Sequence, residues 1–166
     1  MGRPGRGAAR RGEPKAQVAS AANRCLRIVI PSQTSFLGLV REVSERVARM
    51  HDFDAVTAQR LALAVDEATT NSIKHAYGGA AGHEVELRFW ESLDELRIEV
   101  VDDGRALDRR AIPQVDLARY VSEGRTGGLG VHLMSRIMDT VAFRRVAGRN
   151  VCCMRKRRPD RDPSGR

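Results

Sequence analysis

A polar pair on a predicted helix is the part of this sequence best placed to do chemistry. Glu67 and Asn71 lie four residues apart in the run DEATTNSIKH at 66–75, so on a helix both side chains leave from one face. A carboxylate there can act as a general base toward a hydroxyl. A neutral amide oxygen suits Mg²⁺, which takes few protein ligands. Lys74, seven residues after Glu67, can meet a phosphate. The pattern alone also fits a solvated helix face.

A second polar group stands where a predicted strand ends. Asp102, Asp103 and Gly104 follow a segment of alternating apolar residues. A carboxylate at this place can accept a hydrogen bond from the exocyclic amine of adenine, whereas guanine carries a carbonyl there, so the contact would favour ATP. Gly104 lets the backbone pass close to the base. The alternative is an ordinary charged turn.

Glycines gather before a third predicted helix, in the run GRTGGLG at 124–130. Such residues leave backbone N–H groups free to face phosphate oxygens, and a helix N-terminus adds favourable partial charge. The GK[ST] ending of a Walker loop is missing. Residues 105–127 show no single period, and a loop of this length inside a compact domain is usually functional. A flexible helix entry is the alternative, but three such patterns in order indicate a nucleotide pocket.

The intervening sequence supplies the elements that must position these groups. The predicted elements are a strand at 25–30, a helix with apolar positions from Phe36 to Met50 that Ser32 or Thr34 can cap, a helix at about 56–76 capped by Asp54, a hairpin turning at 92–94, a helix opened by 128–130, and a last hairpin of 140–146 and 149–155. Hairpins dominate over crossovers. We therefore expect an α+β two-layer sandwich, a mixed, mostly antiparallel sheet with helices packed on one face.

Side-chain alternation predicts which face each strand buries. In the first hairpin the apolar face holds Val85, Leu87 and Phe89, and the opposite face holds Glu84, Glu86 and Arg88. Cys152 and Cys153 are adjacent on a strand and must point to opposite faces. Together with Cys25 they fit reduced, apolar core thiols in a cytoplasmic protein.

The net charge of +8 suggests nucleic acid or an anionic membrane until its distribution is considered. Residues 1–24 hold six Arg or Lys against one Glu, and 154–166 hold six against two Asp, which leaves 25–153 with 17 basic against 18 acidic residues. We expect disordered basic tails at 1–24 and 156–166 around one domain at 25–155, with no direct nucleic-acid contact. The sequence shows no secretory signal core and no run of membrane-spanning length.

Taken in order, the three patterns resemble the nucleotide-binding boxes of a known superfamily. The run at 66–71 with His75-Ala76-Tyr77 is similar to the N-box of the ATPases that include gyrase, histidine kinases and MutL. Residues 102–104 resemble its first glycine box, although the usual second glycine is Ala106 here. Residues 127–130 resemble its second glycine box. Within the superfamily, the compact domain and the run GGLGVHLMSRIMDTV are most similar to anti-sigma-factor serine/threonine kinases.

The resemblance implies a role for each matching residue. Glu67 would be the catalytic base and Asn71 the Mg²⁺ ligand, while Asp102 would hold adenine with Gly104 beside it. The implied phosphate contacts are Lys74, Arg125, Thr126, Gly127, Gly128, Leu129, Gly130 and Val131, with Arg125 near the γ-phosphate. Residues 105–126 would form a mobile lid over ATP.

The resemblance also implies a function and partners. ATP would phosphorylate a Ser or Thr of an anti-sigma-factor antagonist, and the protein, generally a homodimer in this family, would hold a sigma factor from RNA polymerase. A non-catalytic switch is the alternative, in which ATP sets partner affinity without transfer; Glu67 argues against it. A detached histidine-kinase domain fits less well, because 1–24 is too rich in Gly and Pro for a phosphoacceptor helix pair. A DNA-binding function would rest on the tails alone.

Overall fold

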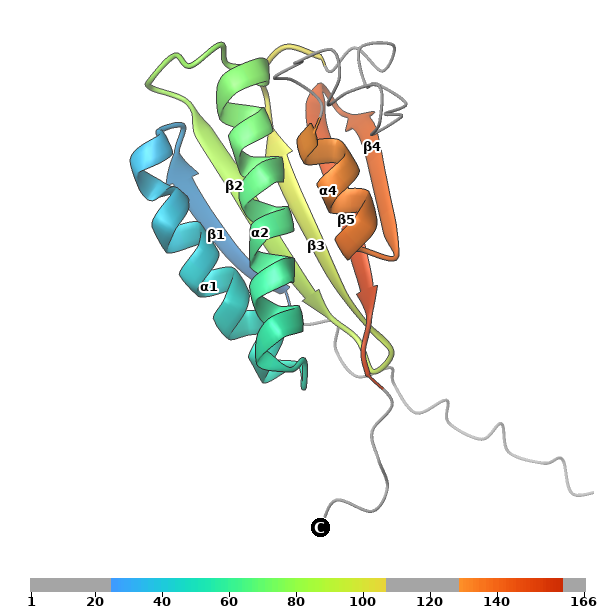
Figure 1. Cartoon of the computed structure of the whole chain (residues 1–166). Helices are drawn as coiled ribbons and strands as arrows, with labels where there is room; N and C mark the ends of the chain where they lie inside the picture. The colour runs from blue at the N-terminus through green and yellow to red at the C-terminus, as the bar shows by residue number, and fades with distance from the viewer. Residues whose placement is uncertain (1–24, 107–128, 160–166) are drawn as a thin grey trace, which may run out of the picture.

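The computed structural model describes residues 25–106 and 129–159, which form two layers (Figure 1). The elements in chain order are β1 (Cys25–Pro31), a 3₁₀ turn (Thr34–Phe36), α1 (Leu37–Met50), α2 (Ala55–Asn71), a π-helical segment (Ser72–Ala76), β2 (Glu84–Glu91), β3 (Glu95–Asp102), α4 (Leu129–Ile137), β4 (Thr140–Val146) and β5 (Arg149–Arg157). The predicted lid at 105–126, except for 105–106, and both expected tails, except for 156–159, lie outside the described residues.

The sheet has five strands in the order β1-β2-β3-β5-β4, and each described pair of neighbours is antiparallel. Helices α1, α2 and α4 cover one face of it (Figure 1). This arrangement confirms the expected α+β sandwich. Antiparallel pairing of β3 with β5 places Asp102, at the end of β3, opposite Asn150, near the start of β5.

Local sequence signals account for the ends of the elements. Asp54 caps α2, because its carboxylate accepts hydrogen bonds from the backbone N–H groups of Val56 and Thr57 at 2.9 and 3.0 Å. The helical segment stops at Gly78, whose φ of 63° is left-handed. Neither expected cap of the first helix is used: Ser32 instead donates to the Ala80 carbonyl, and no side chain caps the 3₁₀ turn before α1.

The main core lies between the helices and the sheet. It is built from apolar side chains that alternate along β2 and β3 and recur along α2, among them Leu61, Val65, Leu87, Phe89 and Ile98. The predicted apolar face of the first hairpin is thus confirmed. The stripe expected on the first helix is only partly buried, since Leu39 and Met50 are exposed.

Within 25–106 and 129–159, the opposite face of the sheet carries no helix but still buries side chains. Val101, Val151 and Cys153 form a second, small apolar cluster there, whereas Cys152 belongs to the main core. The two adjacent cysteines therefore lie on opposite faces, as predicted. Cys25 is exposed, so the expectation that all three thiols lie in the core was wrong for this one. Its strand, β1, is an edge strand of the sheet that the described residues form.

Candidate nucleotide site

The Asp102 carboxylate accepts three hydrogen bonds in the predicted site. Asp102 is the last residue of β3, is 5% exposed and lies on the helix-covered side of the sheet. Its Oδ2 accepts a hydrogen bond from the Ser72 hydroxyl at 2.8 Å. Its Oδ1 accepts from the Asn150 amide at 2.6 Å and from the Gly104 backbone N–H at 3.1 Å. Each carboxylate oxygen has two acceptor positions, so among the described contacts Oδ2 keeps one for a further donor.

Asn150 is held in one orientation by its other contacts. Its Oδ1 accepts from Arg145 at 2.7 Å, which leaves its amide nitrogen directed at Asp102 and at the Arg105 carbonyl, 3.0 Å away. The start of β5 therefore fixes both the carboxylate and the first residues of the long connection. Asn150 was not among the residues expected in the site. Only the β3–β5 register, which pairs it with Asp102, brings it there.

Ser72 was also missed, although it directly follows Asn71. It begins the π-helical segment, which widens the last turn of α2. The widened turn directs Ser72 inward to Asp102, where it is 7% exposed, and leaves Lys74 exposed. The spacing that placed Lys74 on the Glu67 face assumed a continuous α-helix. Its expected phosphate contact stays a prediction.

Gly104 lies against the π-helical segment. A Cβ atom at this position would come within 2.6 Å of the Ala76 carbonyl oxygen, and the Arg105 N–H donates to that same oxygen at 2.9 Å. The structure thus gives a steric reason for the glycine: it lets the chain turn closely past Ala76 after β3. The turn is secured further by Tyr77, whose hydroxyl lies 2.8 Å from Asp103 Oδ1. Burial is the main reason that the pKa of Tyr77 rises to about 12.

Glu67 and Gly130 come together from α2 and α4. A Cβ atom added to Gly130 would lie 2.5 Å from Glu67 Oε2, so the main chain of α4 passes directly beside this carboxylate. The first turn of α4 offers backbone N–H groups without intrahelical partners. Two residues predicted from separate patterns are therefore neighbours in space.

The neighbouring Asp66 has a different environment. Its Oδ1 lies 3.6 Å from Arg41 Nε of α1. Burial raises the pKa of Asp66, and the Arg41 charge opposes this shift. Of the two adjacent acids, Asp66 therefore faces α1 and Glu67 faces α4.

The remaining predicted residues divide into two groups. Asn71 is half-buried at the end of α2, next to Ser72, while Leu129 and Val131 stand in the first turn of α4 beside Gly130. The predicted phosphate contacts Arg125, Thr126, Gly127 and Gly128 lie outside the described residues. The structure thus joins Asp102, the predicted adenine contact, to the α2 segment through Ser72, and joins α2 to α4 through Glu67.

Known proteins match this chain over the same region. The model of the histidine kinase-like ATPase domain matches residues 30–156. The chain belongs to the histidine kinase-like ATPase family. This membership confirms the resemblance that the three boxes suggested, and the family implies that the domain binds ATP.

The histidine kinase-like ATPase family includes relatives with a more specific name. Serine-protein kinase RsbW of Bacillus subtilis (strain 168) is 32% identical to this chain over 128 residues, which cover 74% of the chain and 79% of the relative. The protein of the same name from Bacillus pumilus (strain SAFR-032) is 34% identical over 130 residues, with 74% and 80% covered. That from Listeria monocytogenes serovar 1/2a (strain ATCC BAA-679 / EGD-e) is 29% identical over 120 residues, with 70% and 76% covered. These similarities support kinase activity.

The described residues of this histidine kinase-like ATPase domain offer no carboxylate- or thiolate-rich metal site. In 25–106 and 129–159, no group of three or more His, Cys, Asp or Glu side chains could hold a metal ion. A single amide ligand such as Asn71 fits Mg²⁺, which takes its other ligands from water and substrate phosphates. None of the helices in those ranges has the length and apolar character required to cross a membrane.

Proposed function

We propose that this protein is an ATP-dependent serine/threonine kinase that acts as an anti-sigma factor. The observation that carries the proposal is the hydrogen bond from Ser72 to Asp102, 2.8 Å long. It links the end of β3, where adenine would bind, to the helix that carries Glu67 and Asn71. The adenine contact and the residues expected to act at the phosphates are thereby held on connected elements. Positioning of this kind is what phosphoryl transfer mainly requires.

Adenine would be selected at Asp102. The remaining acceptor position on Oδ2 suits one N–H donor, such as the exocyclic amine of adenine. The carbonyl that guanine carries there would face a carboxylate and be rejected, because two acceptors cannot pair. Ser72, Asn150 and Gly104 would hold the carboxylate in place before the nucleotide arrives.

The phosphates would lie between α2 and α4. The N–H groups at the start of α4, with Leu129, Gly130 and Val131, would face their oxygens. Asn71 would hold a Mg²⁺ ion, which would neutralise phosphate charge when bound. Lys74, Arg125 and residues 126–128 would add further phosphate contacts, and residues 105–126 would close over the nucleotide as a lid.

Glu67 would act on the acceptor hydroxyl. Its carboxylate beside Gly130 would lie near the γ-phosphate of a nucleotide held by α4, where it would accept the proton of an incoming Ser or Thr hydroxyl. The substrate would be an anti-sigma-factor antagonist, and the same protein would sequester a sigma factor. We further propose a homodimer that works in the cytoplasm.

Labelled ATP with Mg²⁺ and the antagonist encoded nearest to this protein tests the proposal. We expect the wild-type protein to label the antagonist, and Glu67→Gln to lower the rate by about 100-fold or more while ATP affinity is retained. Glu42→Gln, an exposed glutamate of α1, is the matched control and should label normally. ATP binding without any label on the antagonist would instead favour a non-catalytic switch.

A further inference from the structure

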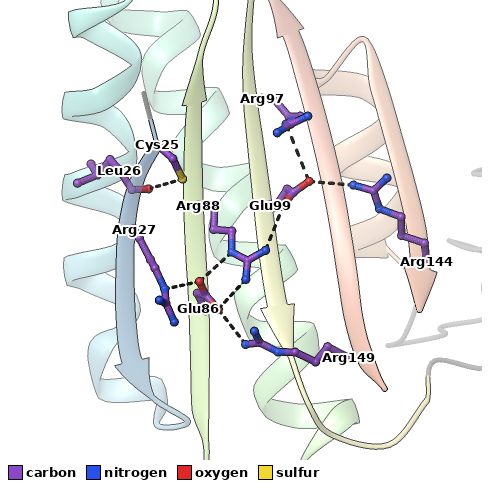
Figure 2. Close-up of polar contacts among 9 residues, drawn as sticks. All are labelled: Cys25, Leu26, Arg27, Glu86, Arg88, Arg97, Glu99, Arg144 and Arg149. Atoms are coloured by element: carbon purple, nitrogen blue, oxygen red, sulfur yellow. Dashed lines mark hydrogen bonds and ion pairs between the residues drawn. The ribbon is translucent and has the colours of Figure 1, made fainter. Parts of the chain in front are cut away.

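The face of the sheet opposite the helices is built around two buried glutamates. Glu86 of β2 is 2% exposed and Glu99 of β3 is 5% exposed. Arginines from all five strands of the sheet gather around them (Figure 2). We call this cluster the arginine face. Its members are Arg27, Glu86, Arg88, Arg97, Glu99, Arg144 and Arg149. Alternation had placed Glu86 correctly on this face, but with no sign that it would be buried.

Glu86 is the centre of the larger half of the arginine face. Its carboxylate accepts hydrogen bonds from Arg88 Nε and Nη2 at 2.8 and 3.0 Å, and from Arg149 Nη2 at 2.9 Å. Arg27 from β1 forms an ion pair with the same group. The hydrogen bond from Arg88 is the main reason that the pKa of Glu86 falls to about 2. This carboxylate therefore stays charged and holds three guanidinium groups in place.

Glu99 organises the other half. Arg144 of β4 donates to its Oε1 at 2.8 Å, and Arg88 Nη1 lies 3.7 Å from its Oε2. Arg97 approaches the same carboxylate at 3.9 Å and also lies over the Trp90 ring, 4.6 Å from its centroid. Arg88 thus joins the two glutamates into one network that crosses the sheet.

The arginine face keeps more positive charge than its glutamates neutralise. Five guanidinium groups surround two carboxylates, a surplus of three positive charges. Each guanidinium has five N–H donors, so most donors remain unused by the two glutamates. The side chains of Arg27 and Arg144 are 64% and 48% exposed. The face therefore presents ordered cationic groups to the outside, and their order lowers the entropy lost when an anion binds.

We propose that the arginine face is a docking surface for an acidic patch on a partner protein. Charge complementarity supplies the attraction, and guanidinium forks match carboxylates in geometry. The composition favours protein over nucleic acid. In the described strands, Arg supplies every cation on this face, and Trp90 and the exposed Val29 and Val146 flank it. Arg and Trp are enriched in protein interfaces.

A second copy of this chain is a poorer occupant than an acidic partner. A twofold dimer places the same patch of both subunits together. Two arginine faces would then bring surplus positive charges into contact, which is costly. A homodimer, as proposed above, would therefore use another surface. The docking proposal is independent of nucleotide binding, because the residues of the candidate nucleotide site lie on the helix-covered side.

Trp90 makes the proposal directly testable, since it is the single tryptophan of the chain and lies under Arg97. The full chain would be titrated with a Trp-free acidic peptide of about 15 residues while Trp90 emission is followed. We expect a saturable change that weakens with added salt. R27Q/R144Q should bind about tenfold more weakly, and R27K/R144K should be intermediate, because lysine keeps the charge and loses the fork.

The matched control removes the same charge from the other layer. Arg46 and Arg60 are exposed on α1 and α2, so R46Q/R60Q should bind within about twofold of the wild type. If the double variant R27Q/R144Q fails to fold, R27Q alone serves, because Glu86 keeps Arg88 and Arg149. An unchanged Trp90 signal, or equal weakening by both double variants, would overturn the proposal.

Two further outcomes would overturn the proposal by assigning the arginine face to a different ligand. Nucleic acid would be the ligand if a DNA duplex, followed by Trp90 emission, bound more tightly than the peptide and lost this binding in R27Q/R144Q. Sedimentation analysis would show a second copy to be the occupant if wild type dimerised and R27Q/R144Q became monomeric. The ATP affinity of R27Q/R144Q, measured in parallel, separates this proposal from the kinase proposal: we expect this affinity to remain at the wild-type value.

Discussion

The sheet holds a buried carboxylate on each face, but surrounds the two with different partners. On the helix-covered face Asp102 is held by neutral donors, the Ser72 hydroxyl, the Asn150 amide and a backbone N–H. On the open face Glu86 is held by the guanidinium groups of Arg27, Arg88 and Arg149. The two residues are almost equally buried, so exposure alone does not distinguish them.

The difference in partners decides which charge each face leaves available. Neutral donors orient Asp102 without cancelling its charge, so the charge stays available to a ligand donor. Guanidinium groups neutralise Glu86, and what remains available on that face is positive. A buried charge is tolerated in either way, because both supply hydrogen bonds in place of water. What each face can bind is set by the group left unpaired.

The largest expected effect is on stability, from the open face. Glu86→Ala would remove the carboxylate that Arg88 hydrogen-bonds and leave it only the more distant Glu99, 3.7 Å away, so the free energy of unfolding should fall by about 3 kcal/mol. Urea denaturation measures this change. Glu95→Ala is the control, since Glu95 and Arg155 form a half-exposed pair at 3.3 Å and should contribute less than about 1 kcal/mol. Equal losses in the two variants would mean that burial of Glu86 contributes nothing.

The next effect is on ligand affinity, from the helix-covered face. Asp102→Asn replaces one charged acceptor by a donor, so ATP affinity should fall by about 30- to 100-fold. Asn150→Ala removes one of the groups that orient the carboxylate and should weaken ATP by about five- to tenfold. Isothermal titration calorimetry on the folded proteins gives both values. Glu86→Gln lies on the other face and should leave the affinity unchanged; unaltered binding by Asp102→Asn would make the adenine assignment wrong.

The smallest expected effect is a difference in pH dependence. The pKa of Glu86 is about 2 in the folded protein, below the ordinary value of 4.5. The unfolded chain therefore binds the proton first, so the contribution of Glu86 is complete above about pH 4.5 and is lost as the pH falls toward 2. Between about pH 5 and 3, the urea midpoint of the wild type should fall more steeply than that of Glu86→Gln. Parallel slopes would contradict this role of the carboxylate.

Much of this architecture was predictable from local patterns. Some signals act within a few residues, so their effects were visible in the sequence. They are the capping carboxylate of Asp54, the alternation at Val85, Leu87 and Phe89, and the glycines at 78 and 79. The three nucleotide boxes were visible for the same reason. Ser72 and Asn150 were not, because their roles depend on a π-helical turn and on strand register.

The sequence by itself determined the elements, the side chains that alternate on each strand, and the residue types of the nucleotide boxes. Only the tertiary structure decided which polar residues meet. Glu86 and Arg149 are separated by 63 positions, and Asp102 and Asn150 by 48 positions. The physical reason is that antiparallel pairing selects partners by register across the sheet. The separation of two residues along the chain does not predict whether they become register partners.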